Sequence, residues 1–275
     1  MSLSPTEADF VRKLVYDRSA IVLDESKEYL IKSRLESLAL ETGHESIDAL
    51  LGETRRGTVG LESKVVEALT TNETSFFRDV APFECLKKNL LPKVLEKRQT
   101  SRSLTIWCAA CSTGQEPYSI SMLLHEHFPN LADWNVRIFG TDISDQVLER
   151  ARSGRYRQLE VNRGLPATML IKYFTRSGTQ WEVAEHVRKR VEFSNLNLIG
   201  EWKLSRRPDI VFLRNVLIYF DVPTKRKILE RVAREMIRDG GLFLGASETT
   251  LNVDPQWTRV GCDKAGYYQV GPETR

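Results

Sequence analysis

Residues 104–119 read LTIWCAACSTGQEPYS and carry the main signal for the fold class. The apolar run 104–109 has the length and composition of a buried strand. The loop that follows contains small residues and Gly114, which allow close approach of the backbone to a ligand, and a helical pattern begins at Pro117. A strand, a tight loop and a helix in this order are typical of the first unit of a doubly wound α/β fold.

The same alternation continues toward the C-terminus. Four more apolar runs of strand length follow, at 136–143, 191–196, 209–215 and 240–245, and helical patterns at 117–128, 145–152 and 223–239 separate several of the strands. Strands that alternate with helices predict right-handed crossovers and a parallel sheet. Residues 165–192 interrupt the alternation with short polar segments, which predict a small antiparallel insert.

Toward the N-terminus the pattern is helical. Ser4, Pro5 and Glu7 match a capping box with proline at the first helical position. Apolar residues then recur at helical spacing and predict further helices at about 26–40, after Ser46 and after Gly60. We therefore expect an all-α domain in residues 1–75, a linker and connecting helix in 76–100, and an α/β domain in 101–275 with its β insert at about 165–192.

Composition and charge exclude several classes of protein. Of the 275 residues, 41% are hydrophobic and 28% are charged, which excludes a mostly disordered chain. Residues 1–75 hold 9 basic and 14 acidic side chains and residues 76–275 hold 31 and 23, so the net charge of +3 hides a split of −5 and +8. The total is too small for a general nucleic-acid binder.

The sequence also bears on location and assembly. No apolar stretch reaches the roughly 18 residues that a membrane-spanning helix needs, and the N-terminus does not resemble a signal peptide. Four cysteines do not make a disulfide scaffold. We expect a cytoplasmic protein without membrane insertion, and a monomer, because nothing indicates an obligate interface.

Two acidic residues follow the first two predicted strands, where doubly wound folds bind their ligands. Glu116 has no basic neighbour in the sequence, and a carboxylate there disfavours a pyrophosphate at the helix N-terminus. Asp142 ends the second strand, where such folds hold ribose hydroxyls. Together they suit adenosine linked to a positive centre. An ordinary tight turn for the loop, and a helix cap for Asp142, remain open.

Further polar residues follow the later strands. Asn197 and Leu198 leave the third predicted strand, and Arg214 and Asn215 interrupt the apolar run of the fourth. Tyr219 comes shortly after and is equally consistent with a core aromatic whose hydroxyl is hydrogen-bonded. These positions are candidates for the walls of a binding site.

The predicted linker carries TNETSFFR (71–78), in which Asn72, Thr74 and Arg78 surround two phenylalanines. This composition is unusual for a connection that needs only flexibility. With this motif, ACSTGQEPYS (110–119), ARSGRY (151–156) and RNVLIYFD (214–221) in order and at family spacing, the chain resembles the CheR family of chemotaxis methyltransferases over residues 1–270. The resemblance implies an enzyme that uses S-adenosylmethionine to methylate glutamates on the cytoplasmic helices of chemoreceptors.

The resemblance also implies a role for each candidate residue. Arg78 and Tyr219 would lie beside the reacting methyl group. The others would bind the cofactor and its product S-adenosylhomocysteine: Asn72, Thr74 and Arg78 at the methionine end, Glu116 at the amino-acid or sulfonium end, Asp142 at the ribose, Asn197 and Leu198 at the adenine, and Arg214 and Asn215 closing the pocket. No metal is implied, and Cys108 and Cys111, a single CxxC, are interpreted as packing residues.

Two departures from the family pattern matter. Residues 175–186 contain only Gly178 where some members carry a Gly-x-Gly loop associated with docking a receptor's C-terminal pentapeptide, which predicts methylation independent of such a peptide. Residues 245–248 read Gly-Ala-Ser-Glu where the family often has Gly-His-Ser-Glu. Two other functions stay open: a small-molecule methyltransferase, which the linker motif and helical domain disfavour, and a non-catalytic sensor of S-adenosylmethionine, which Arg78 and Tyr219 disfavour.

Overall fold

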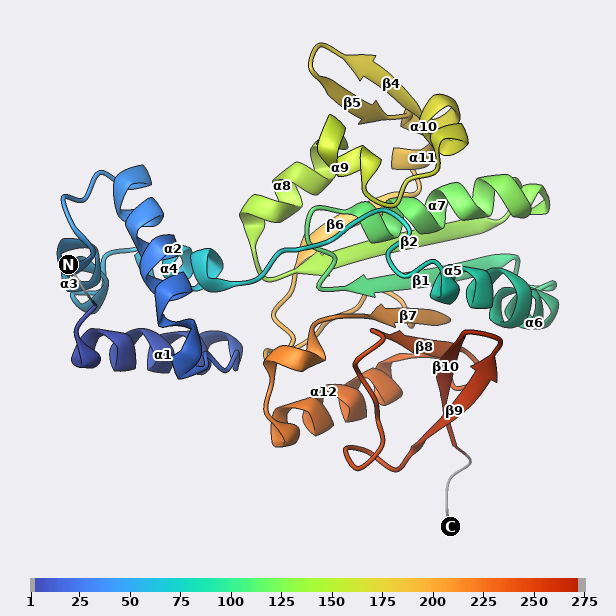
Figure 1. Ribbon diagram of the computed structural model, residues 1–275. Helices are drawn as coiled ribbons and strands as arrows, with labels where there is room; N and C mark the ends of the chain where they lie inside the picture. Colours follow the sequence, from blue (N-terminus) through green and yellow to red (C-terminus); the bar gives the residue numbers. More distant parts are fainter. Residues whose placement is uncertain (1–2, 272–275) are drawn as a thin grey trace. The chain divides into compact units, whose positions relative to one another are not determined.

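A computed structural model describes residues 3–271, and the chain forms two compact units (Figure 1). The first unit extends to Thr71 and also includes Tyr219–Thr224. The second comprises Asn72–Ile218 and the chain from Lys225 onward. The outermost residues of the predicted ranges, 1–2 and 272–275, lie outside the described residues.

The first unit is all-α, as the sequence predicts. Its elements are α1 (Pro5–Ser19), a 3₁₀ turn (Glu25–Lys27), α2 (Glu28–Glu41), α3 (Ile47–Arg55) and α4 (Leu61–Leu69). The capping box is present, because the Glu7 N–H donates to Ser4 Oγ (3.3 Å) and the Ser4 N–H donates to the Glu7 carboxylate (2.9 Å).

The short segment Tyr219–Thr224 packs with these helices. The Tyr16 hydroxyl donates to Asp221 (2.7 Å), and the Val22 N–H donates to the Tyr219 carbonyl (2.9 Å). A piece of the chain that follows the fourth predicted strand therefore belongs to the helical unit. The sequence pattern gave no sign of this, because the contact joins segments about 200 residues apart.

The second unit is built on a seven-stranded sheet. Its strands are β1 (Ser103–Ala109), β2 (Asn135–Asp142), β6 (Val191–Asn195), β7 (Ile210–Leu213), β8 (Gly241–Leu244), β9 (Trp257–Cys262) and β10 (Ala265–Val270). Their order is β6-β2-β1-β7-β8-β10-β9, in which β10 is antiparallel to both β8 and β9 and the other neighbouring pairs are parallel. All five predicted strands are present and parallel, whereas the β9–β10 hairpin was not predicted. The strand order reverses at β1, which places a binding crevice at its carboxyl end.

Helices cover both sides of this sheet. The linker leads into α5 (Ala81–Cys85), a π turn (Leu86–Leu90) and α6 (Leu91–Lys97); α7 (Gln115–His127), a 3₁₀ turn (Pro129–Leu131), α8 (Asp145–Ser153) and α12 (Val222–Glu235) follow, with a 3₁₀ turn (Leu217–Tyr219) before α12. α7 and α8 lie on one side and α12 on the other (Figure 1). Ile106, Phe212 and Phe243 are fully buried, and the last two rings stack at 4.6 Å. The doubly wound fold is confirmed.

A separate three-stranded antiparallel sheet forms the insert. It has the order β3-β5-β4, from β3 (Arg155–Arg157), β4 (Phe174–Ser177) and β5 (Gln180–Val183), with α9 (Gln158–Asn162), α10 (Ala167–Tyr173) and α11 (Glu185–Arg188) beside it. β3 precedes the range 165–192. It has three residues with only Tyr156 buried, so no strand-length apolar run announces it.

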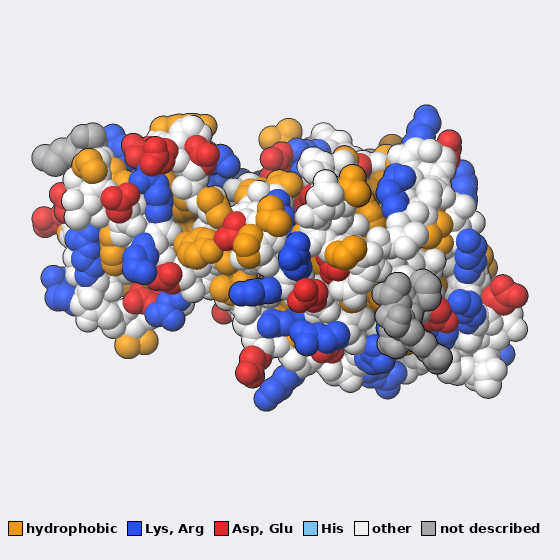
Figure 2. Space-filling view, turned by 90° about the horizontal axis from the view of Figure 1, so that it is seen from below, with side chains coloured by type: hydrophobic (Ala, Val, Ile, Leu, Met, Phe, Trp, Pro, Cys, Tyr) orange, Lys and Arg blue, Asp and Glu red, His pale blue; other side chains and the backbone are white. Residues whose placement is uncertain are grey.

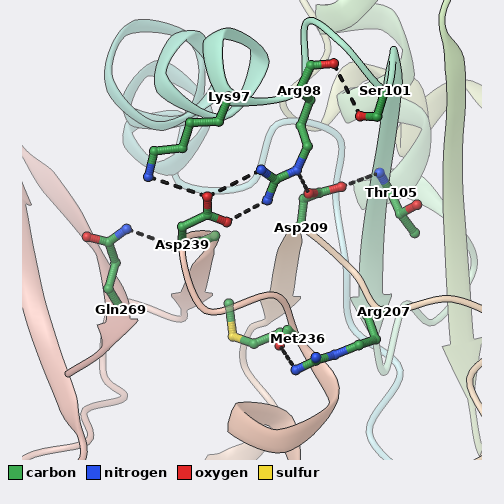
Figure 3. Close-up of polar contacts among 10 residues, drawn as sticks. Lys97, Arg98, Ser101, Thr105, Arg207, Asp209, Met236, Asp239 and Gln269 are labelled. Atoms are coloured by element: carbon green, nitrogen blue, oxygen red, sulfur yellow. Dashed lines mark hydrogen bonds and ion pairs between the residues drawn. The ribbon is translucent and has the colours of Figure 1, made fainter. Parts of the chain in front are cut away.

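An ion-pair network joins the amino ends of the central strands (Figure 3). Arg98, directly after α6, donates from Nε to Asp209 (2.8 Å) and from Nη2 to Asp239 (2.5 Å). Asp209 precedes β7 and also accepts from the Thr105 N–H of β1 (2.9 Å). This network lies at the edge of the sheet opposite to the carboxyl ends.

The four cysteines form one disulfide and two buried free thiols. Cys85 of α5 and Cys262 of β9 form a disulfide with 5.7 Å between their Cα atoms, which the count of four cysteines did not indicate. Cys108 and Cys111 are buried thiols whose pKa burial raises well above the usual value, as packing residues would have. On the face in Figure 2, basic and acidic side chains are mixed over both units. Within residues 3–271, no helix has the length and apolar character to cross a membrane.

Candidate functional site

The carboxyl edge of the large sheet gathers residues with an unusual backbone. Six non-glycine residues near this edge and in the linker have φ between +31° and +64°: Phe77, Asp79, Val80, Ala110, Ser112 and Asn215. A positive φ is costly for a side chain with a Cβ, on the order of 1–3 kcal/mol each, and such residues cluster at functional sites. The backbone therefore marks the same edge that the strand ends marked in the sequence.

Asp142 shapes the loop after β1. Its carboxylate accepts from the Ser112 N–H (2.9 Å) and from the Ser144 N–H (3.1 Å), and the residue is only 6% exposed. These bonds hold Ser112 in its left-handed conformation across the ends of β1 and β2. Asp142 is thus at the strand tip, as predicted, and it supports the loop.

Tyr156, the last residue of the ARSGRY motif, supports the same loop from the other side. Its hydroxyl donates to the Thr113 carbonyl (2.7 Å), and its ring packs edge-on against Phe76 of the linker at 5.0 Å. Gly114 has φ +91°, and a Cβ there would lie 2.9 Å from Ala151 Cβ and 3.2 Å from the Tyr156 hydroxyl. The loop therefore requires glycine at this position.

Arg214 forms the polar centre of the edge. Its guanidinium, with a side chain only 2% exposed, donates to Glu116 (2.8 Å), to Asp79 (2.8 Å) and to the Arg78 carbonyl (3.0 Å). Its buried Nε has no hydrogen-bond partner among the described residues. One guanidinium thus joins the end of β7, the start of α7 and the linker, and it retains a buried N–H without a partner among the described residues, which is uncommon for a buried polar group.

Glu116 has a basic partner in space that its sequence neighbours lack. Arg214 comes 98 residues later and pairs with it at 2.8 Å. Burial raises the pKa of the Glu116 carboxyl, while Arg214 works in the opposite direction. The absence of a basic residue nearby in the sequence was therefore a poor guide to the electrostatics of this loop.

Asn215 is held by a residue to which the sequence gave no role. The Glu248 carboxylate accepts four backbone N–H bonds, from Asn215 (2.7 Å), Val216 (2.9 Å), Ile218 (3.2 Å) and Gly245 (2.7 Å). A Cβ on Gly245 would lie 2.7 Å from Asn215 Nδ2. The Gly-Ala-Ser-Glu segment was noted only for its missing histidine, yet its glutamate fixes the turn after β7.

The linker lies against the loop after β1. The Asn72 carbonyl accepts from Ser112 Oγ (2.7 Å), the Phe77 N–H donates to Ser119 Oγ (2.9 Å), and Arg78 Nη1 donates to the Glu73 carbonyl (3.0 Å). Asn72 and Thr74 line a pocket of about 490 Å³ together with Thr113 and Gln115. The linker motif and the first loop therefore form one wall.

The remaining candidates fall into two groups. Asn197 and Leu198 form the turn after β6, where Asn197 Oδ1 accepts from the Ile199 N–H (3.1 Å) and Leu198 is 8% exposed. Asn195 Nδ2, just before them, donates to the Ile143 carbonyl (2.9 Å) and ties this turn to the end of β2. Tyr219 instead belongs to the helical unit.

Comparisons with known proteins give a family match for each of the two parts of the chain. The family model described as CheR methyltransferase, SAM binding domain, matches residues 72–265, and the model described as CheR methyltransferase, all-alpha domain, matches residues 6–70.

Three curated relatives match nearly the whole chain. Chemotaxis protein methyltransferase 1 of Pseudomonas aeruginosa is 41% identical over 98% of this chain and 100% of its own length. Chemotaxis protein methyltransferase Cher2 of Pseudomonas putida is 40% identical over 98% and 100%. The chemotaxis protein methyltransferase of Vibrio parahaemolyticus is 36% identical over 98% of both chains.

Proposed function

The chain belongs to the CheR family of S-adenosylmethionine-dependent methyltransferases, and on this premise we propose that it methylates glutamate side chains of chemoreceptors to give glutamyl methyl esters. One observation carries the proposal. The linker, the first loop and the end of β7 converge on the buried Arg214, whose Nε lacks a partner among the described residues.

The residues at this edge fit the cofactor. S-adenosylmethionine brings an activated methyl group on a sulfonium, an amino-acid end and a ribose. The Glu116 carboxylate suits the ammonium of the amino-acid end, and the unpartnered Nε of Arg214 suits a carboxylate oxygen. We assign the ribose to Asp142, the adenine to Asn197 and Leu198, the methionine end to Asn72 and Thr74, and closure of the pocket to Asn215.

The chain's task in catalysis is positioning. A glutamate side chain has a pKa of about 4.3, so the acceptor is already a carboxylate near neutral pH and needs no strong base. Arg78 orients that carboxylate through a charge-assisted hydrogen bond, and Tyr219 donates a second bond or lines the path of the methyl group. Holding the acceptor in line with the methyl group is a proximity effect.

The partner surface follows the family. We propose that residues 1–75 act as a domain that docks the cytoplasmic helices of chemoreceptors, that residues 76–100 connect it to the catalytic domain of residues 101–275, and that the protein works as a cytoplasmic monomer. The mixed charges of the visible face give no support to a nucleic-acid partner (Figure 2).

Transfer of labelled methyl groups to chemoreceptor-containing membranes, followed by alkaline release as methanol, tests the function. We expect label in receptor esters, and a loss of at least about 100-fold for Arg78→Ala and for Tyr219→Phe with little change in cofactor affinity. Arg102→Ala, an exposed residue paired with Asp133, is the control and keeps full activity. Cofactor binding without methyl transfer supports a non-catalytic sensor of S-adenosylmethionine. Label found only in small molecules supports a small-molecule methyltransferase.

We also propose that methylation does not depend on a receptor pentapeptide. The β4–β5 hairpin turns at Gly178 and carries no second glycine, in contrast to the loop associated with peptide docking in the family. In a calorimetric titration with a receptor-tail pentapeptide, we expect no saturable heat. Saturable binding in the micromolar range contradicts this part of the proposal.

A further inference from the structure

Asp79 stands next to Arg78 in the linker but outside the motif residues given a role above. Its carboxylate lies 2.8 Å from Arg214 Nη2, and its side chain is 43% exposed whereas that of Arg214 is 2% exposed. A half-exposed acid therefore supplies one of the two counter-charges of a fully buried guanidinium.

The same guanidinium nitrogen grips the linker backbone. Arg214 Nη2 donates both to Asp79 and to the Arg78 carbonyl, at 2.8 and 3.0 Å. Two groups of adjacent residues bonded to one rigid nitrogen fix the backbone between them. The position of the Arg78 side chain follows from that backbone.

The backbone at this place needs such a restraint. Phe77, Asp79 and Val80 have φ values of +47°, +64° and +31°. Left-handed conformations of residues with a Cβ persist only where surrounding contacts hold them. Besides the Arg214 bonds, the Phe77 N–H is held by Ser119 Oγ at 2.9 Å.

Asp79 also matters because Glu116 has two possible partners. Glu116 pairs with Arg214 Nη1 at 2.8 Å, yet it is the carboxylate assigned above to the cofactor's ammonium. A buried guanidinium that loses a share of one counter-charge is costly unless a second remains. Asp79, on the adjacent nitrogen, is that second counter-charge.

We propose that Asp79 is a positioning residue for methyl transfer, which acts through Arg214 to hold Arg78 at the methionine end of the cofactor site. The inference rests on the proposed function. Asp79 does not touch the cofactor in this scheme, so its loss affects turnover more than cofactor binding.

Steady-state kinetics and calorimetry test this division. For Asp79→Asn we expect kcat to fall by roughly 10- to 100-fold, with the dissociation constant for S-adenosylhomocysteine changed by less than about 3-fold. Asp79→Glu, which retains the charge, restores part of kcat. An equal loss of affinity and kcat, or no rescue by glutamate, overturns the proposal.

A double mutant separates positioning from general stability. If Asp79 acts through Arg78, Asp79→Asn adds nothing to the loss caused by Arg78→Ala, because coupled residues are not additive. If the loss of kcat in the double mutant is instead the product of the two single losses, the proposal is overturned. Asp133→Asn is the matched control, since it removes an exposed acid paired with Arg102 at 2.5 Å and leaves kcat unchanged.

A measurement without substrate keeps the inference separate from the proposed function. In the protein alone, Asp79→Asn is expected to speed amide hydrogen exchange across residues 76–80 by at least about 10-fold, with no change in the amides of β1. Unchanged exchange in the linker overturns the proposal even if the wild-type protein methylates receptors. Failure of methylation with faster exchange refutes the proposed function alone.

Discussion

The two ends of the large sheet each place one arginine between two carboxylates, and they use it differently. At the amino ends, Arg98 binds Asp209 and Asp239, and its Nε is one of the bonded donors (Figure 3). At the carboxyl ends, Arg214 binds Glu116 and Asp79, and its Nε has no partner among the described residues. All three guanidinium nitrogens of Arg98 donate hydrogen bonds within the protein, whereas the Nε of Arg214 does not.

Residues with a strained backbone are more numerous around Arg214 than around Arg98. Near Arg214, Asp79 and Asn215 have positive φ. Both carboxylate oxygens of Glu248 accept hydrogen bonds from backbone N–H groups around the turn after β7. At the amino ends, Asp209 accepts from the regular strand β1. Arg102, directly before β1, also has a positive φ of +44°, so the clearer difference between the two ends is hydrogen bonding: the Arg98 guanidinium is fully paired, whereas the Nε of Arg214 has no partner among the described residues.

Removal of Arg98 is expected to have the largest effect on stability. Arg98→Ala leaves Asp209, with a side chain only 4% exposed, without its charge partner. Breaking a buried ion pair costs about 3–5 kcal/mol, so denaturant unfolding should show a loss of that size. Cofactor affinity of the folded protein should stay unchanged.

Arg102→Ala is the control for the effect of Arg98→Ala on stability. Arg102→Ala removes an ion pair whose two side chains are both 61% exposed, and such surface pairs contribute roughly 0–1 kcal/mol. If Arg98→Ala weakened cofactor binding as much as stability, the separation between the two ends of the sheet would be wrong.

Removal of Arg214 should act mainly on binding. Arg214→Ala takes away the unpartnered Nε donor and leaves Glu116 and Asp79 without their cation. Loss of a buried charge partner costs about 2–5 kcal/mol, which corresponds to roughly 30- to 4,000-fold in the dissociation constant for S-adenosylhomocysteine. Calorimetric titration measures it, and Arg98→Ala is the matched control. Unaltered affinity would remove Arg214 from the site.

The strands of the large sheet could be predicted where they form apolar runs of strand length in the sequence. β1, β7 and β8 are buried along almost their whole length, so they stand out as continuous apolar runs. β2 is buried mainly toward its carboxyl end, and β6, at the edge of the sheet, buries only Val191. The β9–β10 hairpin escaped prediction because each strand buries only two of its six residues, and its polar positions hide the period.

The position of a candidate residue in the fold was predictable where the residue ends a strand, as Asp142 ends β2. Glu248 was missed because its role depends on amides of residues 30 to 33 positions earlier that the fold brings within reach. The pairing of Glu116 with Arg214 was missed for the same reason. No local pattern encodes a side chain that bonds to a distant turn.

Asp142→Asn should have a smaller effect than loss of Arg214. The asparagine keeps one acceptor but turns an NH₂ toward one of the two amides, Ser112 or Ser144, that the carboxylate now holds. The unsatisfied amide lowers stability, and the ribose loses a charged acceptor. A hydrogen bond to a charged group contributes about 1.5–3 kcal/mol, so cofactor affinity should fall roughly 10- to 150-fold, measured by calorimetry. Asp263→Asn, in the exposed β9–β10 turn, is the control. Unchanged affinity contradicts the assignment of Asp142 to the cofactor.

The smallest expected effect is a pH dependence of opposite sign at Glu116 and at Asp239, although burial also raises the pKa of Asp209 beside Asp239. Burial raises the pKa of Glu116, Arg214 and Arg78 lower it, and Glu248 raises it further. At the amino ends, the Arg98 guanidinium lowers the pKa of Asp239. The folded state therefore binds a proton at Glu116 more readily than the unfolded chain does, and at Asp239 less readily.

The sign of each effect follows from these shifts. The carboxylate form of Glu116 pairs with the cofactor's ammonium, so affinity should weaken as pH falls through its raised pKa, by at most about tenfold per pH unit for one proton. Without cofactor, the stability contributed by Glu116 is greatest below that pKa and is lost as pH rises through it. The stability contributed by Asp239 is present above the pKa of this group in the unfolded chain, and it is lost as pH falls through the lowered pKa of the folded state. Glu116→Gln should flatten the affinity profile and remove the loss of stability as pH rises through the Glu116 pKa, whereas Asp239→Asn should remove only the loss of stability at acid pH. If either variant removed the acid loss of stability and also flattened the affinity profile, the two ends would titrate as one system.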